Sequence, residues 1–205
     1  GTEVIKVEKP IAGDDTRHWG PPYLTSQQDA NPTNSAYFLS ANRGKQSITV
    51  DIRQKEGQAI IHQLVKSCDV LIENFKVGGL QKYQLDFASL SAINPKLIYC
   101  SITGFGQNGP YAQRAGYDFL LQGMGGLMSV TGEPDHLPGG GPQKVGVALT
   151  DILTGMYATT AIQGAIIERE KSGLGQHIDL ALLDVQVACL ANQSMNYLVG
   201  QETPK

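Results

Sequence analysis

Short apolar segments and amphipathic segments alternate along the first half of the chain. Four segments rich in apolar and β-branched side chains predict strands, at residues 4–8, 46–52, 70–72 and 97–102. Helical spacing covers residues 56–68, and another helix is predicted between Asp86, its N-cap, and Asn94, where the following proline stops it. This alternation, with strands of continuous apolar character, predicts a parallel sheet with helices on its faces.

The second half of the chain has longer helical patterns. Helical spacing covers residues 117–130 and 151–171, a strand is predicted at 177–180, and a last helix extends to about residue 198. Residues 9–34 differ from both halves because they are rich in Pro, Gly, Asp and Asn, which predicts one long loop. A loop of this length in a compact domain is expected to be functional or held by a partner.

Composition and charge narrow the classes of partner. The 205 residues carry 16 basic and 19 acidic side chains, a formal charge of -3, so there is no basic field that would hold a nucleic-acid backbone. No stretch approaches the ~18 consecutive apolar residues that a membrane helix needs. We therefore expect neither nucleic acid nor a membrane as a partner.

The cysteines and histidines do not have the spacing of a metal site. Cys68, Cys100 and Cys189 lie far apart in apolar runs, which favours buried thiols in a reducing compartment over a disulfide framework. The four histidines are equally scattered, so no zinc-like cluster and no metal are expected.

Two glycine-rich segments are candidates for ligand loops. Residues 104–109 have the G-x-G-x-x-G spacing of dinucleotide-binding folds. Pro110 follows directly, the next residues do not begin a clear helix, and no strand ending in an acidic residue appears about 20 positions later. A plain glycine-rich loop is therefore the favoured interpretation, and residues 139–141 predict a flexible surface loop.

Asn74 and Phe75 follow the strand predicted at 70–72, at the carboxyl edge of the sheet, where open α/β sheets bind ligands. With Lys76 and Lys82 nearby, an aromatic ring and an amide would suit a nucleotide base and its phosphates. The alternative is a solvated turn with a buried Phe, and these residues alone favour that alternative.

Asp151 precedes a long predicted helix that contains several small residues. An Asp at this position is ordinarily an N-cap, and the helix terminus would also favour its ionised carboxylate, the form that attacks an electrophile. Capping and nucleophilic roles are compatible, and the pattern alone favours the cap. Tyr117 with Asp118, and His177 with Asp179, also pair possible acid/base groups, but both pairs are expected to be structural, the second through cross-strand pairing.

Seven segments together carry a resemblance to a known family: 3–8, 13–17, 42–45, 73–75, 114–118, 151–155 and 173–176. In this order, and over essentially all of the chain, they resemble class III coenzyme A transferases, the formyl-CoA and carnitine CoA-transferase family. The resemblance implies an α/β fold with a Rossmann-like parallel sheet and flanking helices. Because family members are roughly twice as long, residues 1–205 are expected to be the N-terminal part of the large domain, truncated at both ends and inactive as an isolated fragment.

The same resemblance implies the site residues. Asp151 matches the catalytic aspartate of the family. The positions that match CoA contacts are Lys9, Val50, Arg53, Asn74, Phe75, Lys82, Arg114, Ala115, Gly116 and Tyr117. Lys9 and Lys82 stand where some members have Arg, which keeps the charge but loses bidentate phosphate binding.

The implied reaction moves coenzyme A from an acyl-CoA donor to a free carboxylic acid through a covalent aspartyl intermediate, without a metal. The whole protein is expected to be an interlocked homodimer, cytoplasmic, or mitochondrial in a eukaryote.

Two alternatives stay open. The first is an α-methylacyl-CoA racemase-like isomerase, which shares the fold. It is disfavoured because Tyr117 stands where those racemases carry His, and a tyrosine, with a pKa near ~10, is a poor base at neutral pH. The second is a CoA-binding protein without catalysis, which the intact Asp151 argues against.

Overall fold

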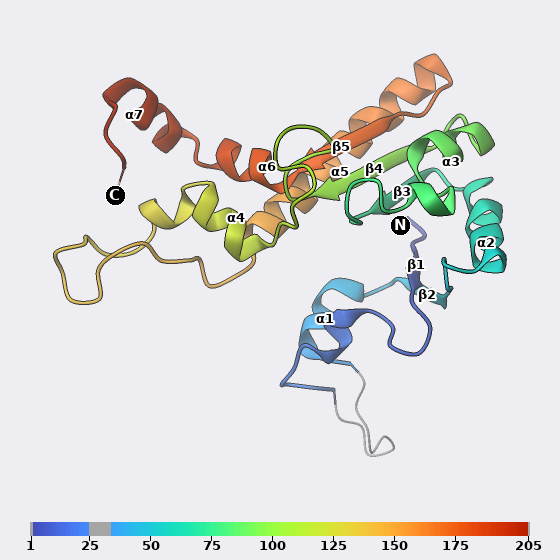
Figure 1. The fold of residues 1–205 in the computed structure, drawn as a ribbon, viewed down its shortest axis with the longest axis horizontal. Coiled ribbons are helices and arrows are strands. Elements are labelled where there is room, and N and C mark those ends of the chain that lie inside the picture. Colours follow the sequence, from blue (N-terminus) through green and yellow to red (C-terminus); the bar gives the residue numbers. More distant parts are fainter. Residues whose placement is uncertain (1, 25–33, 205) are drawn as a thin grey trace. The chain divides into compact units, whose positions relative to one another are not determined.

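The computed structural model describes residues 2–24 and 34–204 and divides into two compact units, Gly1–Ile61 (unit 1) and His62–Lys205 (unit 2). Helix α2, Lys55–Val65, runs across this division of the sequence. The predicted α/β class with parallel strands is confirmed, but the described strands form two sheets, one in each unit. Figure 1 shows the elements of each unit.

In unit 1, strands β1, Ile5–Glu8, and β2, Gln46–Thr49, pair in parallel. The long predicted loop between them contains a short 3-10 helix, η1, Asp15–His18, and residues 25–33 of that loop lie outside the described part of the chain. Helix α1, Ala36–Asn42, was not predicted, although its N-cap is an ordinary one: the Ser35 hydroxyl accepts the Phe38 N–H at 3.0 Å.

A buried ion pair ties the loop of unit 1 to its sheet. The Glu8 carboxylate, on a residue only 5% exposed, accepts Nε and Nη2 of Arg17, both at 2.8 Å. It also accepts the Ser47 hydroxyl at 2.7 Å and the Asp14 N–H at 2.8 Å. These donors, Arg17 first, lower the pKa of Glu8 to about 2. Arg17 in turn lies 3.9 Å from the centre of the Phe38 ring.

The sheet of unit 2 has the order β3-β4-β5, with all strands parallel: β3 is Val70–Glu73, β4 is Ile98–Thr103 and β5 is His177–Ala181. The central strand β4 carries the core, because Ile98, Tyr99 and Cys100 are at most 2% exposed. Helix α3, Phe87–Ile93, has Asp86 as its N-cap, as predicted. The Asp86 side chain, however, accepts the Ser89 hydroxyl at 2.5 Å and no backbone N–H of the helix.

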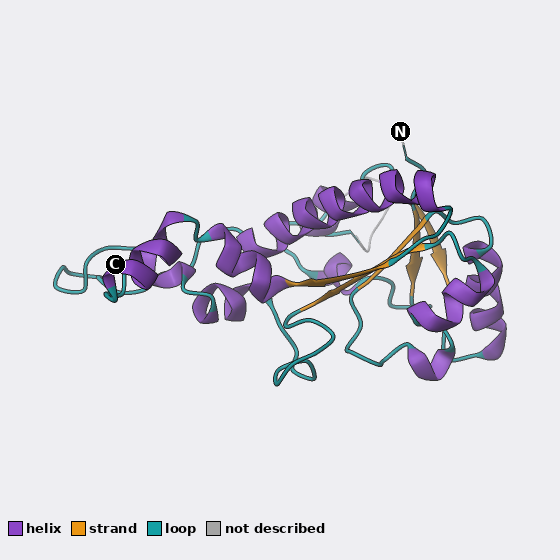
Figure 2. Ribbon diagram, turned by 90° about the horizontal axis from the view of Figure 1, so that it is seen from above, coloured by secondary structure: helices purple, strands orange, loops and turns teal. Residues whose placement is uncertain are grey.

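Helix α5, Leu149–Ser172, runs along one face of this sheet and contacts β4 and β5 (Figure 2). Two predicted helices are each divided in two. The first is interrupted at Gly126, where φ is +84°, and becomes α4, Asp118–Met124, and the 3-10 helix η3, Leu127–Val130. The last is interrupted at Ala191, where φ is +50°, and becomes α6, Leu182–Cys189, and α7, Asn192–Gly200.

None of the described helices combines the length and the apolarity that a membrane-spanning helix requires. Cys68, Cys100 and Cys189 are free thiols, and burial raises the pKa of Cys100 to about 11.

Candidate functional site

The turn after β3 presents an aromatic ring to solvent. Phe75 is 47% exposed, so the alternative of a buried Phe is wrong. The Glu73 carboxylate accepts the Phe75 N–H at 2.7 Å and fixes the turn that also exposes Asn74. Lys82 follows in the 3-10 helix η2, Gln81–Tyr83, with its ammonium 4.8 Å from the centre of the Tyr83 ring. Asn74 and Phe75 thus lie directly after the carboxyl end of β3, and Lys82 follows them in η2.

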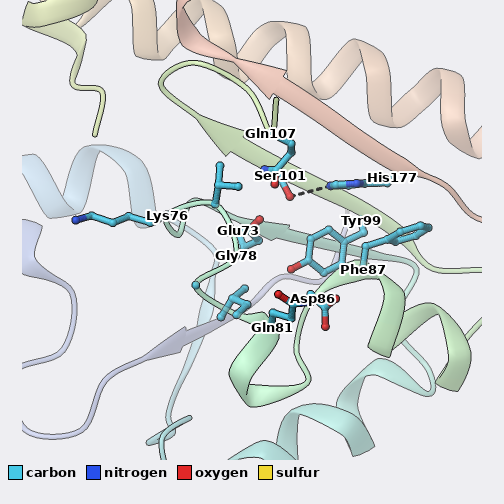
Figure 3. A pocket seen from close by; sticks show the side chains of 13 residues that line it. Glu73, Lys76, Gly78, Gln81, Asp86, Phe87, Tyr99, Ser101, Gln107 and His177 are labelled. Atoms are coloured by element: carbon cyan, nitrogen blue, oxygen red, sulfur yellow. Dashed lines mark hydrogen bonds between the residues drawn. The ribbon is translucent and has the colours of Figure 1, made fainter. Parts of the chain in front are cut away.

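A small pocket of about 60 Å³ opens beside this turn (Figure 3). It is lined by side chains from the sheet and its loops, including Glu73, Lys76, Ser101, Gln107 and His177. The Ser101 hydroxyl and the His177 Nε2 lie 2.9 Å apart across β4 and β5, so the predicted cross-strand pairing of His177 is confirmed.

The glycine-rich segment after β4 is a plain loop, as predicted, because no helix lies between the end of β4 and Asp118. Its backbone packs directly against a later segment: a Cβ on Gly104 would lie 2.6 Å from the Gly116 Cα. This close approach brings residues 114–117 to the carboxyl end of β4. Within that segment the Arg114 guanidinium lies 4.7 Å from the centre of the Tyr111 ring. The loop is also held by Asp179, whose carboxylate accepts the Gln107 N–H at 2.9 Å.

Asp151 is not the N-cap of its helix, so that prediction is wrong. Helix α5 begins two residues earlier, its N-cap is Ala148, and Asp151 lies in the first turn. Alanine has no side-chain acceptor, and the cap comes instead from Asp118 at the start of α4. One oxygen of the Asp118 carboxylate, Oδ2, accepts the N–H of Thr150 at 2.8 Å and the N–H of Asp151 at 3.2 Å.

Buried amides surround this cap. The fully buried Gln122 donates its Nε2 to Asp118 Oδ1 at 2.6 Å and accepts the Val145 N–H at 2.9 Å. The Thr150 hydroxyl donates to Oε1 of Gln186 at 2.5 Å. Gln186 is also fully buried, and its Nε2 has no partner within residues 2–24 and 34–204. These glutamines are not among the predicted site residues, because their only signal in the sequence is a polar residue inside an apolar helical pattern.

The Asp151 carboxylate accepts no hydrogen bond from any described residue. Although Asp151 has substantial exposed surface, crowding of its carboxyl group by neighbouring atoms raises its pKa, and the nearby Asp118 carboxylate raises it further. The expectation that the helix start favours the ionised form is therefore wrong in its net direction. A carboxylate with a raised pKa is a stronger base and nucleophile once it is deprotonated.

The candidates in unit 1 lie on its loops. The Lys9 ammonium forms an ion pair with Asp15, and Val50 is buried, with 6% of its surface exposed. The Arg53 guanidinium donates to both oxygens of Asp51, at 2.8 and 2.9 Å, and this contact lowers the pKa of Asp51 to about 2.

In unit 2 the structure brings the segment from Arg114 to Tyr117, with Ala115 and Gly116, next to the first turn of α5, since Asp118 follows it directly. Among the residues that the structure describes, no three His, Cys, Asp or Glu side chains are grouped as metal ligands.

Comparison with known sequences decides the family. The sequence model of CoA-transferase family III matches residues 1–205. The chain belongs to this family. The resemblance seen in its sequence motifs is therefore confirmed.

Two relatives within CoA-transferase family III illustrate the similarity. The chain is 58% identical over 204 residues to a succinate–glutarate CoA-transferase of Agrobacterium fabrum, covering 100% of this chain and 50% of that protein. It is 48% identical to a human succinyl-CoA:glutarate CoA-transferase, covering 100% of this chain and 44% of that protein. The chain thus spans about half the length of the curated relatives it matches.

The fold agrees with the family as well. A crystal structure of a CAIB/BAIF family protein from Brucella suis superposes with a TM-score of 0.93 at 58% identity, over 100% of this chain and 52% of that one.

Proposed function

We propose that this chain is the nucleophile-bearing part of a class III acyl-CoA:carboxylate CoA-transferase. The observation that carries the proposal is the Asp151 carboxylate. Its backbone is fixed at the first turn of a 24-residue helix, and no described residue hydrogen-bonds its side chain. This is the arrangement that a nucleophile needs, because the attacking atoms are oriented but not occupied. The match of the whole chain to CoA-transferase family III supports this assignment.

The proposed reaction proceeds by exchange at one carboxyl group. An Asp151 oxygen attacks the thioester carbonyl, the C–S bond breaks, and a mixed anhydride and CoA thiolate form. The thiolate then attacks the Asp151 carboxyl carbon, which releases the donor acid and leaves an aspartyl-CoA thioester. The acceptor carboxylate attacks this thioester, and the thiolate leaves and attacks the acceptor carbonyl, which regenerates the Asp151 carboxylate. No water takes part, so the energy of the thioester is conserved.

The remaining predicted residues are proposed to bind coenzyme A. Exposed Phe75 offers a ring for stacking on the base, and Asn74 beside it offers an amide for hydrogen bonding. Lys82 and Arg114 supply positive charge for phosphate groups. Lys9 and Arg53 of unit 1 are proposed to bind phosphate groups of coenzyme A by exchanging their present carboxylate partners for phosphates. Val50 of unit 1 is proposed as a further contact of coenzyme A.

The substrate acids are proposed to be short dicarboxylates. The two relatives described above are named for succinate or succinyl-CoA and glutarate, and a protein of Acetobacter aceti, 38% identical over 100% of this chain, is named for oxalate. The whole protein is proposed to work as a homodimer in the cytoplasm, or in mitochondria in a eukaryote.

The test is a search for the covalent intermediate. The natural-length protein is incubated with succinyl-CoA, digested, and analysed by mass spectrometry, with glutarate then added to follow formation of glutaryl-CoA. We expect a CoA-derived mass on the peptide that contains Asp151 and its loss on addition of glutarate. Transfer to glutarate without any adduct on that peptide would contradict the covalent route. Exchange of an α-proton of a 2-methylacyl-CoA for deuterium, without acid exchange, would favour the racemase alternative.

A further inference from the structure

Asp118 is more closely bound to the candidate nucleophile than an ordinary helix cap requires. A cap normally comes from the residue that begins the helix, yet here it comes from another helix, 33 positions away from Asp151. Oδ2 accepts two N–H groups of α5, one of which belongs to Asp151 itself. The Asp118 carboxylate is therefore fixed against the backbone of the nucleophile.

The other oxygen of Asp118 is fixed as well. Oδ1 accepts Nε2 of Gln122, which is completely buried and which also holds the segment leading into α5 through the Val145 N–H. Three N–H donors thus hold one carboxylate, an acceptor-only group when ionised, in a single orientation. A charge that is held in this way cannot turn away from Asp151.

We propose that Asp118 is a positioning residue of the transferase: its carboxylate fixes the backbone of Asp151, and its negative charge favours the neutral, covalently modified forms of Asp151 over the free carboxylate. This inference rests on the proposed function.

The first half-reaction removes the negative charge of the Asp151 side chain. Free Asp151 carries a negative charge close to that of Asp118, and like charges in proximity repel. In the aspartyl-CoA thioester Asp151 is neutral, and the negative charge has left with the released donor carboxylate. The nearby Asp118 therefore raises the free energy of the starting state and not that of the thioester.

The pKa of Asp151 also indicates that Asp118 favours the neutral forms of the Asp151 side chain. The Asp118 carboxylate contributes to the raised pKa of Asp151, after the crowding of the Asp151 carboxyl group by neighbouring atoms. Protonation and acylation both remove the charge of this carboxylate, so a neighbour that favours the first also favours the second.

The experiment measures an equilibrium constant rather than a rate. The natural-length protein is equilibrated with mixtures of succinyl-CoA and succinate, and intact-protein mass spectrometry gives the fraction that carries CoA. The constant for enzyme plus succinyl-CoA going to aspartyl-CoA enzyme plus succinate is compared between wild type and Asp118→Asn. The introduced amide keeps an oxygen that can accept the N–H groups of α5 but removes the charge, and it turns an NH2 group toward Gln122 Nε2, so the hydrogen bond to Gln122 is lost. We expect the constant to fall about five- to tenfold.

Two further variants separate charge from structure. Asp184→Asn removes a carboxylate from the first turn of α6 and should leave the constant unchanged. Asp118→Glu keeps the charge, so its constant should lie within about twofold of the wild-type constant even if its turnover is slower. The equilibrium constant depends on the charge beside Asp151 and not on how fast the two forms of Asp151 interconvert. If Asp118→Asn does not fold, a five- to tenfold fall of the constant in Asp118→Glu would overturn the charge assignment.

The outcomes distinguish this inference from the function on which it rests. A wild type that acquires CoA on Asp151, with a lower constant in Asp118→Asn, supports both. A wild type that acquires CoA, with an equal constant in a folded Asp118→Asn protein, overturns the role of Asp118 and leaves the transferase proposal standing. A wild type that acquires no CoA overturns the covalent function and this inference with it.

Discussion

The two units hold their candidate site residues in opposite ways. In unit 1 the cations proposed to bind phosphates are already occupied: Lys9 contacts Asp15, and Arg53 contacts both oxygens of Asp51. In unit 2 the backbone of Asp151 is held by Asp118, while no described residue hydrogen-bonds its carboxylate. A ligand of unit 1 must therefore replace an internal ion pair, whereas an electrophile at Asp151 displaces no protein partner.

The units also differ in what makes them stable. Unit 1 depends on a buried charge pair, Glu8 with Arg17, which ties its loop to its sheet. Unit 2 has an apolar central strand, β4, and neutral amides such as Gln122 around the start of α5. Acid should therefore loosen unit 1 before unit 2, because protonating a paired carboxylate removes its stabilisation.

The largest effect on CoA transfer is expected from substitution of Asp151, whose carboxylate has no described hydrogen-bond partner. Asp151→Asn should reduce CoA transfer by more than about 10³-fold while CoA still binds, because the amide keeps the shape but is not a competent nucleophile. Transfer is measured by chromatography of acyl-CoAs and binding by calorimetry, with intact mass to exclude deamidation back to Asp. Asp184→Asn is the matched control. Normal turnover in Asp151→Asn would end the covalent hypothesis.

The next effect is on the charge pair of unit 1. Glu8→Gln leaves Arg17 without its bidentate partner and should cost about 3 kcal/mol of local stability. Hydrogen exchange by mass spectrometry should then show faster exchange in β1 and η1, with β4 unchanged. Glu56→Gln, at an exposed carboxylate in the first turn of α2, is the control and should change neither.

The sign of the pH dependence follows from the lowered pKa of Glu8. Its pKa falls from 4.5 to about 2 on folding, so its stabilisation is complete above 4.5 and is lost as the pH falls towards 2. The difference in exchange between wild type and Glu8→Gln should therefore shrink over this range. A difference in exchange between the two proteins that stayed constant down to a pH of about 2 would contradict the role of the Glu8 charge.

The sequence predicted the parts of the fold that depend on local patterns. The strand at β4 and the stop at Asn94 follow from an apolar run and a proline, and both are present. The breaks at Gly126 and Ala191 were missed because apolar spacing continues through them, while the backbone there has positive φ. The division into two sheets was missed because strand pairing is a long-range property that the alternation of elements does not determine.

At the candidate site, too, local sequence patterns did not reveal a long-range contact. Asp151 is predicted as the catalytic residue because it matches a motif of the family. The sequence pattern also predicts Asp151 as the N-cap of its own helix, because an Asp at the start of a helix is usually the cap. The actual cap, Asp118, comes from a distant segment that the close contact of Gly104 and Gly116 brings into place. Such a contact between two glycines leaves no signal in hydrophobic periodicity.

Substitution of the proposed phosphate ligands should have smaller effects and should distinguish the two units. Lys82→Ala and Arg53→Ala should both raise the KM for succinyl-CoA, by up to about fivefold, with less change in kcat, because contacts remote from the thioester supply uniform binding. We expect Lys82→Ala to have the larger effect, since Arg53 must exchange Asp51 for a phosphate. Both effects should decrease at high salt. An unchanged KM in both variants would count against this location for coenzyme A.

The smallest expected effect tests whether the carboxylate of unit 1 competes with the ligand. Asp51→Asn keeps an oxygen for the Arg53 N–H but removes the charge that binds the guanidinium, in a pair whose Arg side chain is 73% exposed. Exposed ion pairs are weak because water and salt screen them, so removing this competitor should lower the KM for succinyl-CoA by only about twofold at low salt. Steady-state kinetics at two ionic strengths measure the change, with Glu56→Gln as the control. A KM that rises instead would mean that Asp51 preorganises Arg53 for phosphate binding, and the contrast between an occupied unit 1 and an unoccupied Asp151 would then not describe how the ligand is bound.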